Sequence, residues 1–524
     1  MLLGADPFAF SPVGGAGILP TGLAGPAPFY FSDRGWSGEP NDTIWPNRHF
    51  APRVEQALNL SRSIPVSPLD QQRVVPIAGS LSLLNADGGL DAMVSDMAID
   101  GREVEIRVGS PLYDGSQFET LFKGTAGGWN VADQGRIELN LRDLVWPLDR
   151  PIQPNLYGGT GGLDGSADLA GTPKPLTFGR ARNVPLKLID PVNLIYQFHD
   201  GAAGGVTALY VKGAAWTPSV DVADIMLAAP SAGCFATQLS GGYVRLGSSP
   251  AGGTVTADVI GDNTWGVAAM TTAAIVYRIL RHRLDLADGL MDSSSFMALN
   301  LAWPGIIGLH IPSQATSAVQ VLNRLLGPVL GFLNHGRNGR LRVGTLALSA
   351  LSGPLAATPK LTLDSRDILE ISRVPLPDTI NPPFWRASIG WGVNWNTMAV
   401  EDIAGSVFDT EPDRFQFLTS QIRYTPWEDA AVIVRHPEAQ DIYVDSLFDE
   451  KPDADLLGAT IGAFYGEMRT MARLRCMQQG YLLETNDVIR VDNPRYGLAG
   501  GRSVVVAGVD LDLQTRSSSV LIMW

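Results

Sequence analysis

One β-rich pattern occurs near both ends of this 524-residue chain. The first copy contains Ile106, Pro111, Tyr113, Gly124 and a strand-like stretch over 137–141, and the second contains Ile489, Pro494, Tyr496, Gly508 and a stretch over 520–523. The Ile-to-Pro spacing is 5 and the Pro-to-Tyr spacing is 2 in both copies, while Tyr-to-Gly is 11 in the first and 12 in the second. Each copy is typical of a strand, a Pro-containing turn, a strand with a Gly bend and a closing strand.

This repetition predicts two related β-domains. The spacing pairs Ile106 with Ile489, Pro111 with Pro494, and Gly124 with Gly508. The alternative is a chance similarity between short β-rich segments. Because turn residues and strand ends agree together, we favour duplication.

Composition indicates several domains built from short strands. With 45% hydrophobic residues, the chain is long enough for three or four separate cores. Its 57 Gly and 36 Pro exceed the usual combined share of ~12% and are spread along the chain, which indicates many turns. The only cysteines, Cys234 and Cys476, have neither a disulfide nor a metal-site pattern, which favours assembly inside a cell.

The N-terminal segment is apolar but does not have the features of a membrane anchor. Frequent Gly and Pro interrupt it, and no stretch of the chain has 18 uninterrupted apolar residues, so we expect no membrane insertion. The aromatic residues between Phe8 and Phe31 would need burial. We therefore predict that residues 1–35 form an extended arm lying across a neighbouring subunit or another protein.

The net charge of −14 excludes duplex nucleic acid as a groove partner. Acid is concentrated over 401–455, where 14 Asp and Glu face 4 Lys and Arg. Two interpretations need only the composition: solvated outer loops, or a surface that pairs with a basic partner.

The pattern along the chain predicts a mainly β protein with an α+β insert. We expect an arm over 1–35, a β-barrel over 36–150, a β-rich inserted domain over 151–265, a small α+β domain over 266–355, and a second β-barrel over 356–524. Within these we predict helices over 271–286 and 317–330 and a hairpin over 332–346. A long helix is predicted from its N-cap Asp453 to Met477, with Gly480 as its stop.

No catalytic, cofactor or metal motif is present, so we predict a protein that is not an enzyme. His199-Asp200 fits the end of a strand better than a catalytic pair, and the Gly-rich stretch 157–165 fits a connector. Acid pairs such as Asp258/Asp262 and Glu428/Asp429 are expected by chance among 53 acids. The aromatic set Trp385, Trp391 and Trp395 fits a sheet or subunit interface better than a sugar-stacking platform.

Several segments resemble tail-tip hub proteins of long-tailed bacteriophages and of related prophage or gene-transfer particles. Arg53 to Gly109 is similar to the N-terminal region of these proteins. Later parts of them resemble Pro173 to Gly179 with Asn183-Val184-Pro185 and Tyr196 to Gly201, Gly247 to Val259, and Asp378 to Asn381. Through these short motifs the resemblance extends over most of residues 36–524.

The resemblance implies a structural virion protein at the tail tip, assembled in the host cytoplasm. It implies a homotrimeric baseplate hub, in which two barrels per subunit make six similar units that continue a hexameric tail tube. The implied partners are the tail tube or distal tail protein, the tape-measure protein, and a tip fibre or central spike, with transient passage of genomic DNA. If the chain forms such a ring, the resemblance implies a third interpretation of the acidic stretch 401–455, as the wall of the DNA channel, with Glu428, Asp429 and Asp441 as candidate wall residues. It implies no catalytic residues and no cofactor. Alternatives are a receptor- or carbohydrate-binding tail-tip protein, which needs an exposed aromatic groove, and a cell-wall hydrolase.

Overall fold

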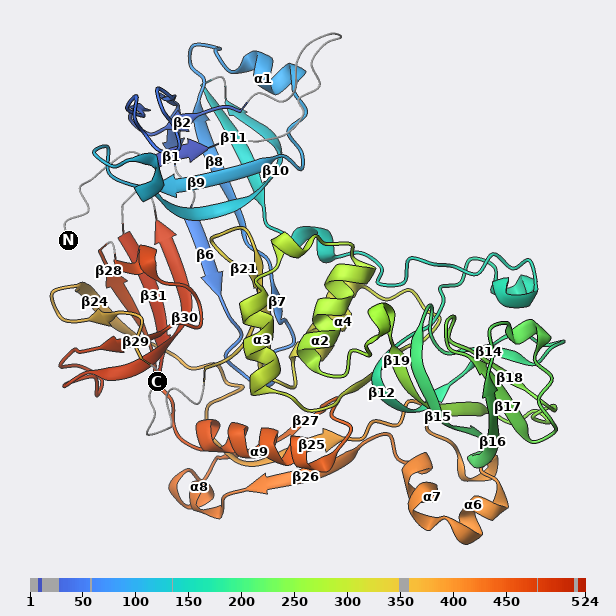
Figure 1. Ribbon diagram of the computed structural model, residues 1–524. Coiled ribbons are helices and arrows are strands. Elements are labelled where there is room, and N and C mark those ends of the chain that lie inside the picture. Colours follow the sequence, from blue (N-terminus) through green and yellow to red (C-terminus); the bar gives the residue numbers. More distant parts are fainter. Residues whose placement is uncertain are drawn as a thin grey trace.

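The computed structural model describes residues 8–11, 28–56, 59–133, 135–347, 358–477, 479–512 and 517–524. The described strands form five sheets, and the fold is mainly β with an α+β insert, as predicted. In Figure 1 the sheet from the N-terminal part lies above the sheet from the C-terminal part, while the middle of the chain extends away from both.

The first sheet has nine strands in the order β3-β4-β2-β1-β9-β10-β11-β8-β5. Their bounds are β1 (Phe8–Ser11), β2 (Phe31–Ser32), β3 (Trp36–Ser37), β4 (His49–Pro52), β5 (Val54–Gln56), β8 (Ala78–Leu84), β9 (Glu103–Val108), β10 (Glu119–Asp133) and β11 (Arg136–Arg142). On β11 the apolar residues Ile137, Leu139 and Leu141 alternate with more exposed polar ones, so one face of the sheet is buried.

The last sheet has the order β23-β29-β30-β31-β28-β24. Its strands are β23 (Thr362–Leu363), β24 (Ile368–Val374), β28 (Met471–Cys476), β29 (Val488–Val491), β30 (Arg502–Asp512) and β31 (Ser517–Met523). The additional strand β6 (Asn59–Ser63) also pairs with β30. The two sheets share one hydrophobic core, in which Leu81 and Leu139 of the first belong to the same buried cluster as Leu474 and Val520 of the last.

These two sheets contain the same four-stranded unit. The orders β8-β11-β10-β9 and β28-β31-β30-β29 match strand for strand, and every pair in both units is antiparallel. Each long strand carries a bulge at the same place, between Ala126 and Gly128 in β10 and between Val506 and Gly508 in β30. The structure therefore confirms that the chain contains two related β-units.

The predicted residue pairing between the copies is wrong by a few positions. Aligning the bulges makes Gly128, rather than Gly124, the counterpart of Gly508, and Val104, rather than Ile106, the counterpart of Ile489. In the first unit, β9 and β10 pair further towards their turn and include a second bulge between Thr120 and Phe122. Pro111 and Pro494 are therefore at different sequence separations from the equivalent residues Val104 and Ile489. The equal Ile-to-Pro spacings in the sequence do not reflect structural equivalence.

The middle of the chain forms a second nine-stranded sheet, in the order β13-β14-β18-β17-β16-β15-β19-β12-β20. Its strands are β12 (Leu176–Pro185), β13 (Lys187–Asp190), β14 (Ile195–Gln197), β15 (Ala203–Val211), β16 (Ala214–Asp221), β17 (Cys234–Gln238), β18 (Tyr243–Leu246), β19 (Val255–Asp262) and β20 (Gly308–Ile311). The strands over 176–262 confirm the β-rich character predicted for this stretch.

The α+β insert connects this sheet to the two related units (Figure 1). It contains α2 (Thr272–Arg278), a π-helical turn over Ile279–Arg283, α3 (Ser293–Ala302), α4 (Ala318–Leu326) and the hairpin β21 (Gly331–His335) and β22 (Leu341–Thr345). The predicted helices near 271–286 and 317–330 and the predicted hairpin are confirmed. Helix α3 was not predicted.

The predicted long helix exists but is wrong at both ends. Helix α9 spans Lys451–Tyr465, with Glu450 rather than Asp453 as its N-cap and Gly466 as its C-cap, because Pro452 at the second helical position lets the helix begin before Asp453. Strand β28 follows over Met471–Cys476. Met471, Leu474 and Cys476 are buried in the sheet core, where a pairing with β31 overrides the local helical pattern. Helix α9 packs on a sheet made of β25 (Phe384–Trp391), β26 (Arg423–Glu428) and β27 (Gln440–Val444).

Residues 1–7 and 12–27 of the predicted arm lie outside the described residues. Of the remainder, Phe8–Ser11 pairs as β1 with β9 and β2, so this segment lies on the sheet of its own chain and not across a neighbour. Nearby, Trp36, Trp45, Phe50 and Phe118 form a buried aromatic cluster. The aromatic residues after the arm thus gain their burial within the chain.

Candidate functional site

The histidine considered as a catalytic candidate is a buried structural group. His199 is fully buried, its Nδ1 accepts a hydrogen bond from the Thr177 amide (3.1 Å), and its Nε2 lies 3.6 Å from an Asp262 oxygen. Asp200, its neighbour in sequence, instead lies 3.4 Å from the Arg283 guanidinium. Burial lowers the pKa of His199, which keeps the ring neutral.

The acid pairs also have separate structural partners. Asp262 pairs with Arg278; burial would raise the pKa of Asp262, but His199 and Arg278 hold it below its ordinary value. Asp258 accepts hydrogen bonds from the Asn183 amide (2.7 Å) and the Tyr210 hydroxyl (3.0 Å).

The second acid pair is likewise structural. Glu428 pairs with Arg386 at 3.2 Å, and Asp429 accepts the Ala431 amide (2.9 Å) as the N-cap of α8 (Ala430–Arg435). All four carboxylates of these two pairs therefore have structural partners of their own. Within the described ranges, no group of three or more His, Cys, Asp or Glu is placed to hold a metal ion.

The three tryptophans do not form a sugar platform. Trp391 and Trp395 pack against the largest hydrophobic core, and Trp385 on β25 is half-buried. The Arg423 guanidinium covers the Trp391 ring at 3.9 Å, and that of Arg324 lies 4.8 Å from the Trp395 ring. Trp391 and Trp395 therefore lie between packed layers of the chain, which is the position expected of aromatic residues at a sheet interface.

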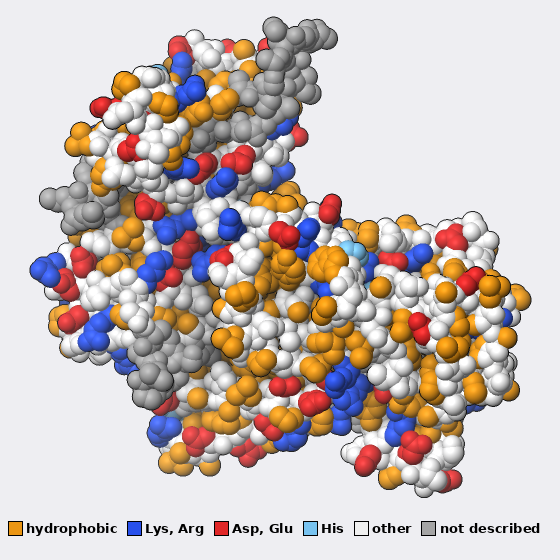
Figure 2. Space-filling model, in the orientation of Figure 1, with side chains coloured by type: hydrophobic (Ala, Val, Ile, Leu, Met, Phe, Trp, Pro, Cys, Tyr) orange, Lys and Arg blue, Asp and Glu red, His pale blue; other side chains and the backbone are white. Residues whose placement is uncertain are grey.

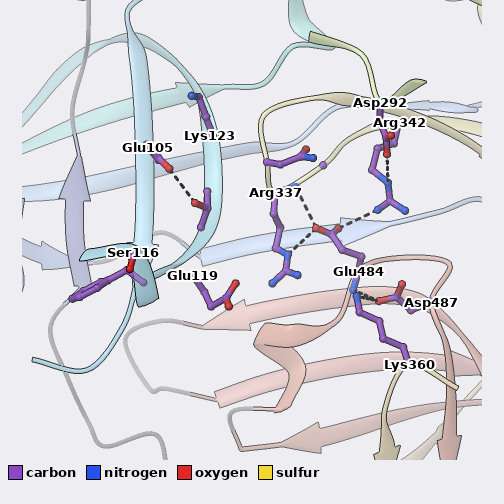
Figure 3. A pocket seen from close by; sticks show the side chains of 14 residues that line it. Glu105, Ser116, Glu119, Lys123, Asp292, Arg337, Arg342, Lys360, Glu484 and Asp487 are labelled. Carbon is purple, nitrogen blue, oxygen red and sulfur yellow. Dashed lines mark hydrogen bonds and ion pairs between the residues drawn. The ribbon is translucent and has the colours of Figure 1, made fainter. Parts of the chain in front are cut away.

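A pocket lined mainly by charged and polar side chains lies where the two related units meet the hairpin of the insert (Figure 3). It is a cavity of about 650 Å³ lined by residues of β9, β10, the β21–β22 hairpin and the segment before β29. At its base, the Glu484 carboxylate lies 2.8 Å from Arg337 Nε, 3.4 Å from Arg62 Nη1 and 3.7 Å from Arg342 Nη1.

The Glu484 cluster joins three parts of the chain. Arg62 comes from β6, Arg337 and Arg342 come from the hairpin, and Glu484 precedes β29. Burial would raise the pKa of Glu484, but the three guanidinium groups lower it below its ordinary value. Arg62 is almost completely buried, so the carboxylate is needed to balance its charge.

His335 strengthens the same junction. Its Nε2 lies 2.6 Å from the Lys123 carbonyl oxygen on β10, so it donates to that oxygen, while its Nδ1 accepts the Leu144 amide at 3.3 Å. Burial lowers the pKa of His335 to about 4. The neutral ring therefore connects β21 to the first unit at neutral pH.

Sequence reasoning missed the Glu484 cluster because its members are far apart in the chain. Arg62 and Glu484 are separated by 422 positions, and no spacing rule connects them. Locally, Arg62 lies between two serines on β6 and Glu484 lies outside the strands, and many exposed charged residues have surroundings of this kind.

A second candidate surface is an apolar groove between α2 and α3. Trp265, Val267, Met297 and Leu301 are exposed there, around a cavity of about 880 Å³. In Figure 2, hydrophobic side chains gather on the face over α2 and α3. Exposed apolar patches of this kind are typical of interaction surfaces rather than of reaction sites.

The acidic stretch divides into paired and free carboxylates. Asp449 pairs with Arg180 and Arg182, and the channel candidates Glu428 and Asp441 both lie near Arg386. The exposed acids of this stretch without an ion pair among the described residues are Glu401, Asp402, Asp409, Glu411, Asp413, Glu438 and Asp445. The first five are on or beside helices α6 (Gly405–Thr410) and α7 (Pro412–Thr419). The channel interpretation stays a prediction; of its three candidates, Glu428 and Asp441 lie near Arg386 and Asp429 caps α8.

No family model matches the chain, and no curated protein matches it. Among solved structures, a tail protein from Neisseria meningitidis is similar over 99% of this chain and 97% of its own, with 9% identity and a TM-score of 0.40. A prophage tail protein from Shewanella oneidensis is similar over 91% of this chain and 96% of its own, with 10% identity and a TM-score of 0.34.

A protein in the virion of a native gene transfer agent particle is similar over 67% of this chain and 84% of its own, with 14% identity and a TM-score of 0.39. These structures belong to the class of tail proteins that the sequence resemblance indicated. With TM-scores no higher than 0.40, they do not decide the function, which we infer from the chain itself. None of the helices in the described parts of the chain has the length and apolar content to cross a membrane.

Proposed function

We propose that this chain is a structural virion protein, the hub of a phage-type tail tip or baseplate. The observation that carries the proposal is the repeated unit, whose strand order and bulge position agree between the first and last sheets. Three copies of such a chain supply six similar units, which matches a six-fold tube without six chains. The shared core and the Glu484 cluster support this role because they hold the two units in one fixed arrangement.

In this role the chain is a homotrimer without catalytic residues or a cofactor. Its partners are the tail tube or distal tail protein on one side, the tape-measure end, and the tip fibre or central spike on the other. The domain limits 36–150, 151–265, 266–355 and 356–524 belong to the same proposal. The exposed groove between α2 and α3 is a surface suited to one of these protein contacts.

The oligomeric state tests the hub proposal. Native mass spectrometry of the purified full-length chain is expected to show trimers that dissociate on dilution. A chain that stays monomeric at high micromolar concentration, or that forms dimers alone, contradicts the proposal.

One observation favours a second candidate, carbohydrate binding at the tail tip. A cleft of about 830 Å³ beside α4 is bordered by the exposed rings of Tyr424 and Tyr443, whose centroids are 5.5 Å apart. The Tyr424 hydroxyl donates to Asp445 at 2.6 Å. Exposed rings beside fixed polar groups are suited to sugars. On a glycan array, the native chain would bind and Tyr443→Ala would not, whereas equal signals from both exclude this cleft.

A further inference from the structure

The two related units differ at one edge. In the last sheet, residues Gly508–Asp512 of β30 pair with β31 on one side and with β6 on the other. The bulge alignment makes residues 128–132 of β10 the equivalent stretch of the first sheet. Along this stretch the structure shows pairing with β11 only, as far as its described residues extend. Among the described residues, the first unit therefore has an open edge where the last unit has a strand.

Side-chain burial shows the same difference. Leu511, beside β6, is 3% exposed, and its counterpart Val131 on β10 is 58% exposed. Val509 is buried, and its counterpart Trp129 is half-buried, with an indole Nε1 that has no hydrogen-bond partner among the described residues. An apolar side chain next to unpaired main-chain groups forms a template for strand addition.

The strand that fills the edge in the last unit comes from the preceding unit. The segment pairs first with β8 of the first unit as β5. It then pairs with β30 of the last unit as β6, which Figure 1 shows running from the first sheet towards the last. The chain thus connects its first unit to its second by adding a strand to the second. The described parts of the chain contain no third such unit that could make the same connection to the open edge of β10.

We infer that residues 128–132 of β10 accept an extended strand from a second copy of this chain. The inference rests on the proposed function, since a closed ring requires each unit to be connected to the next. It extends an interface already present within the chain, the β6–β30 pairing, to the boundary between copies. The incoming strand would form main-chain hydrogen bonds with β10, and one of its apolar side chains would pack against Val131.

The test combines hydrogen–deuterium exchange with one matched pair of variants. In the native trimer, amides of residues 128–132 should exchange slowly, and dilution to monomers should make them exchange fast. Val131→Arg should weaken trimer formation by at least about tenfold, because it places a charge where an apolar side chain would be buried. The control Val220→Arg, at a position of 59% exposure on β16, should leave trimer formation unchanged.

The outcomes separate this inference from the hub proposal. If the amides of residues 128–132 exchange as fast in trimers as in monomers, the inference is overturned and the hub proposal stands. Slow exchange of these amides in both trimers and monomers has the same consequence. Equal effects of Val131→Arg and Val220→Arg overturn it as well. If Val131→Arg fails to fold, the exchange rates of the native chain alone decide. A chain that is monomeric under all conditions overturns both proposals.

Discussion

At the scale of single residues, the arrangement of the two units depends on buried charge. Glu484 balances Arg62, Arg337 and Arg342, and Arg62 has a side chain only 4% exposed. Glu484→Gln leaves that guanidinium without a counter-charge, so we predict a loss of about 3 kcal/mol in the free energy of unfolding. The matched control is Glu467→Gln, whose carboxylate is exposed and pairs with Arg469 at 3.4 Å. Denaturant unfolding measures both, and equal midpoints would contradict the assigned role.

The same junction makes stability depend on pH through His335. Burial lowers its pKa to about 4, with Arg62 lowering it and Glu484 raising it, whereas the unfolded chain binds this proton near pH 6.5. The contribution of neutral His335 is therefore fully present above about pH 6.5 and falls by about 1.4 kcal/mol per pH unit down to the folded pKa. We predict that His335→Gln flattens the dependence of unfolding free energy on pH between 6.5 and 4.5. Parallel curves for the native chain and the variant would contradict this.

At the scale of elements, helix α9 depends on a close approach to β26. A Cβ added at Gly462 would lie 2.1 Å from the Trp427 ring, while one added at Gly405, at the start of α6, would meet nothing within 4 Å. Gly462→Ala should thus lower the thermal midpoint, with a cost of about 1–3 kcal/mol from overpacking. Gly405→Ala should be neutral or stabilising by up to about 1 kcal/mol. Similar melting curves for the two variants would show that α9 does not pack as described.

Whole-element prediction from the sequence succeeded where one local pattern dominates. Apolar periodicity predicts α2 and α4, and the turn Gly336–Gly339 predicts the β21–β22 hairpin. It failed over 466–477, where pairing with β31 decides the structure, and at α3, whose apolar side chains include exposed Met297 and Leu301. The duplication was visible in the sequence. The residue-by-residue pairing of the two copies was wrong because β9 and β10 form a longer ladder than β29 and β30.

At the scale of the whole molecule, two contacts join the related units into one body. Strand β6 adds to β30, and the two sheets bury a common core. Neither contact was predictable, because each joins segments separated by most of the chain, and the partners of a buried charge such as Glu484 are known only after folding. The repeated unit itself was predictable, since strand and turn patterns are local.

The central claim is that three copies form a ring of six related units. Cryo-electron microscopy of the purified full-length chain tests it most directly. We predict closed trimers in which the first and last sheets alternate around one axis with near-six-fold symmetry, and in which β6 connects the units within each copy. A trimer whose two sheets lie at unrelated radii, or particles without a closed ring, would contradict the account.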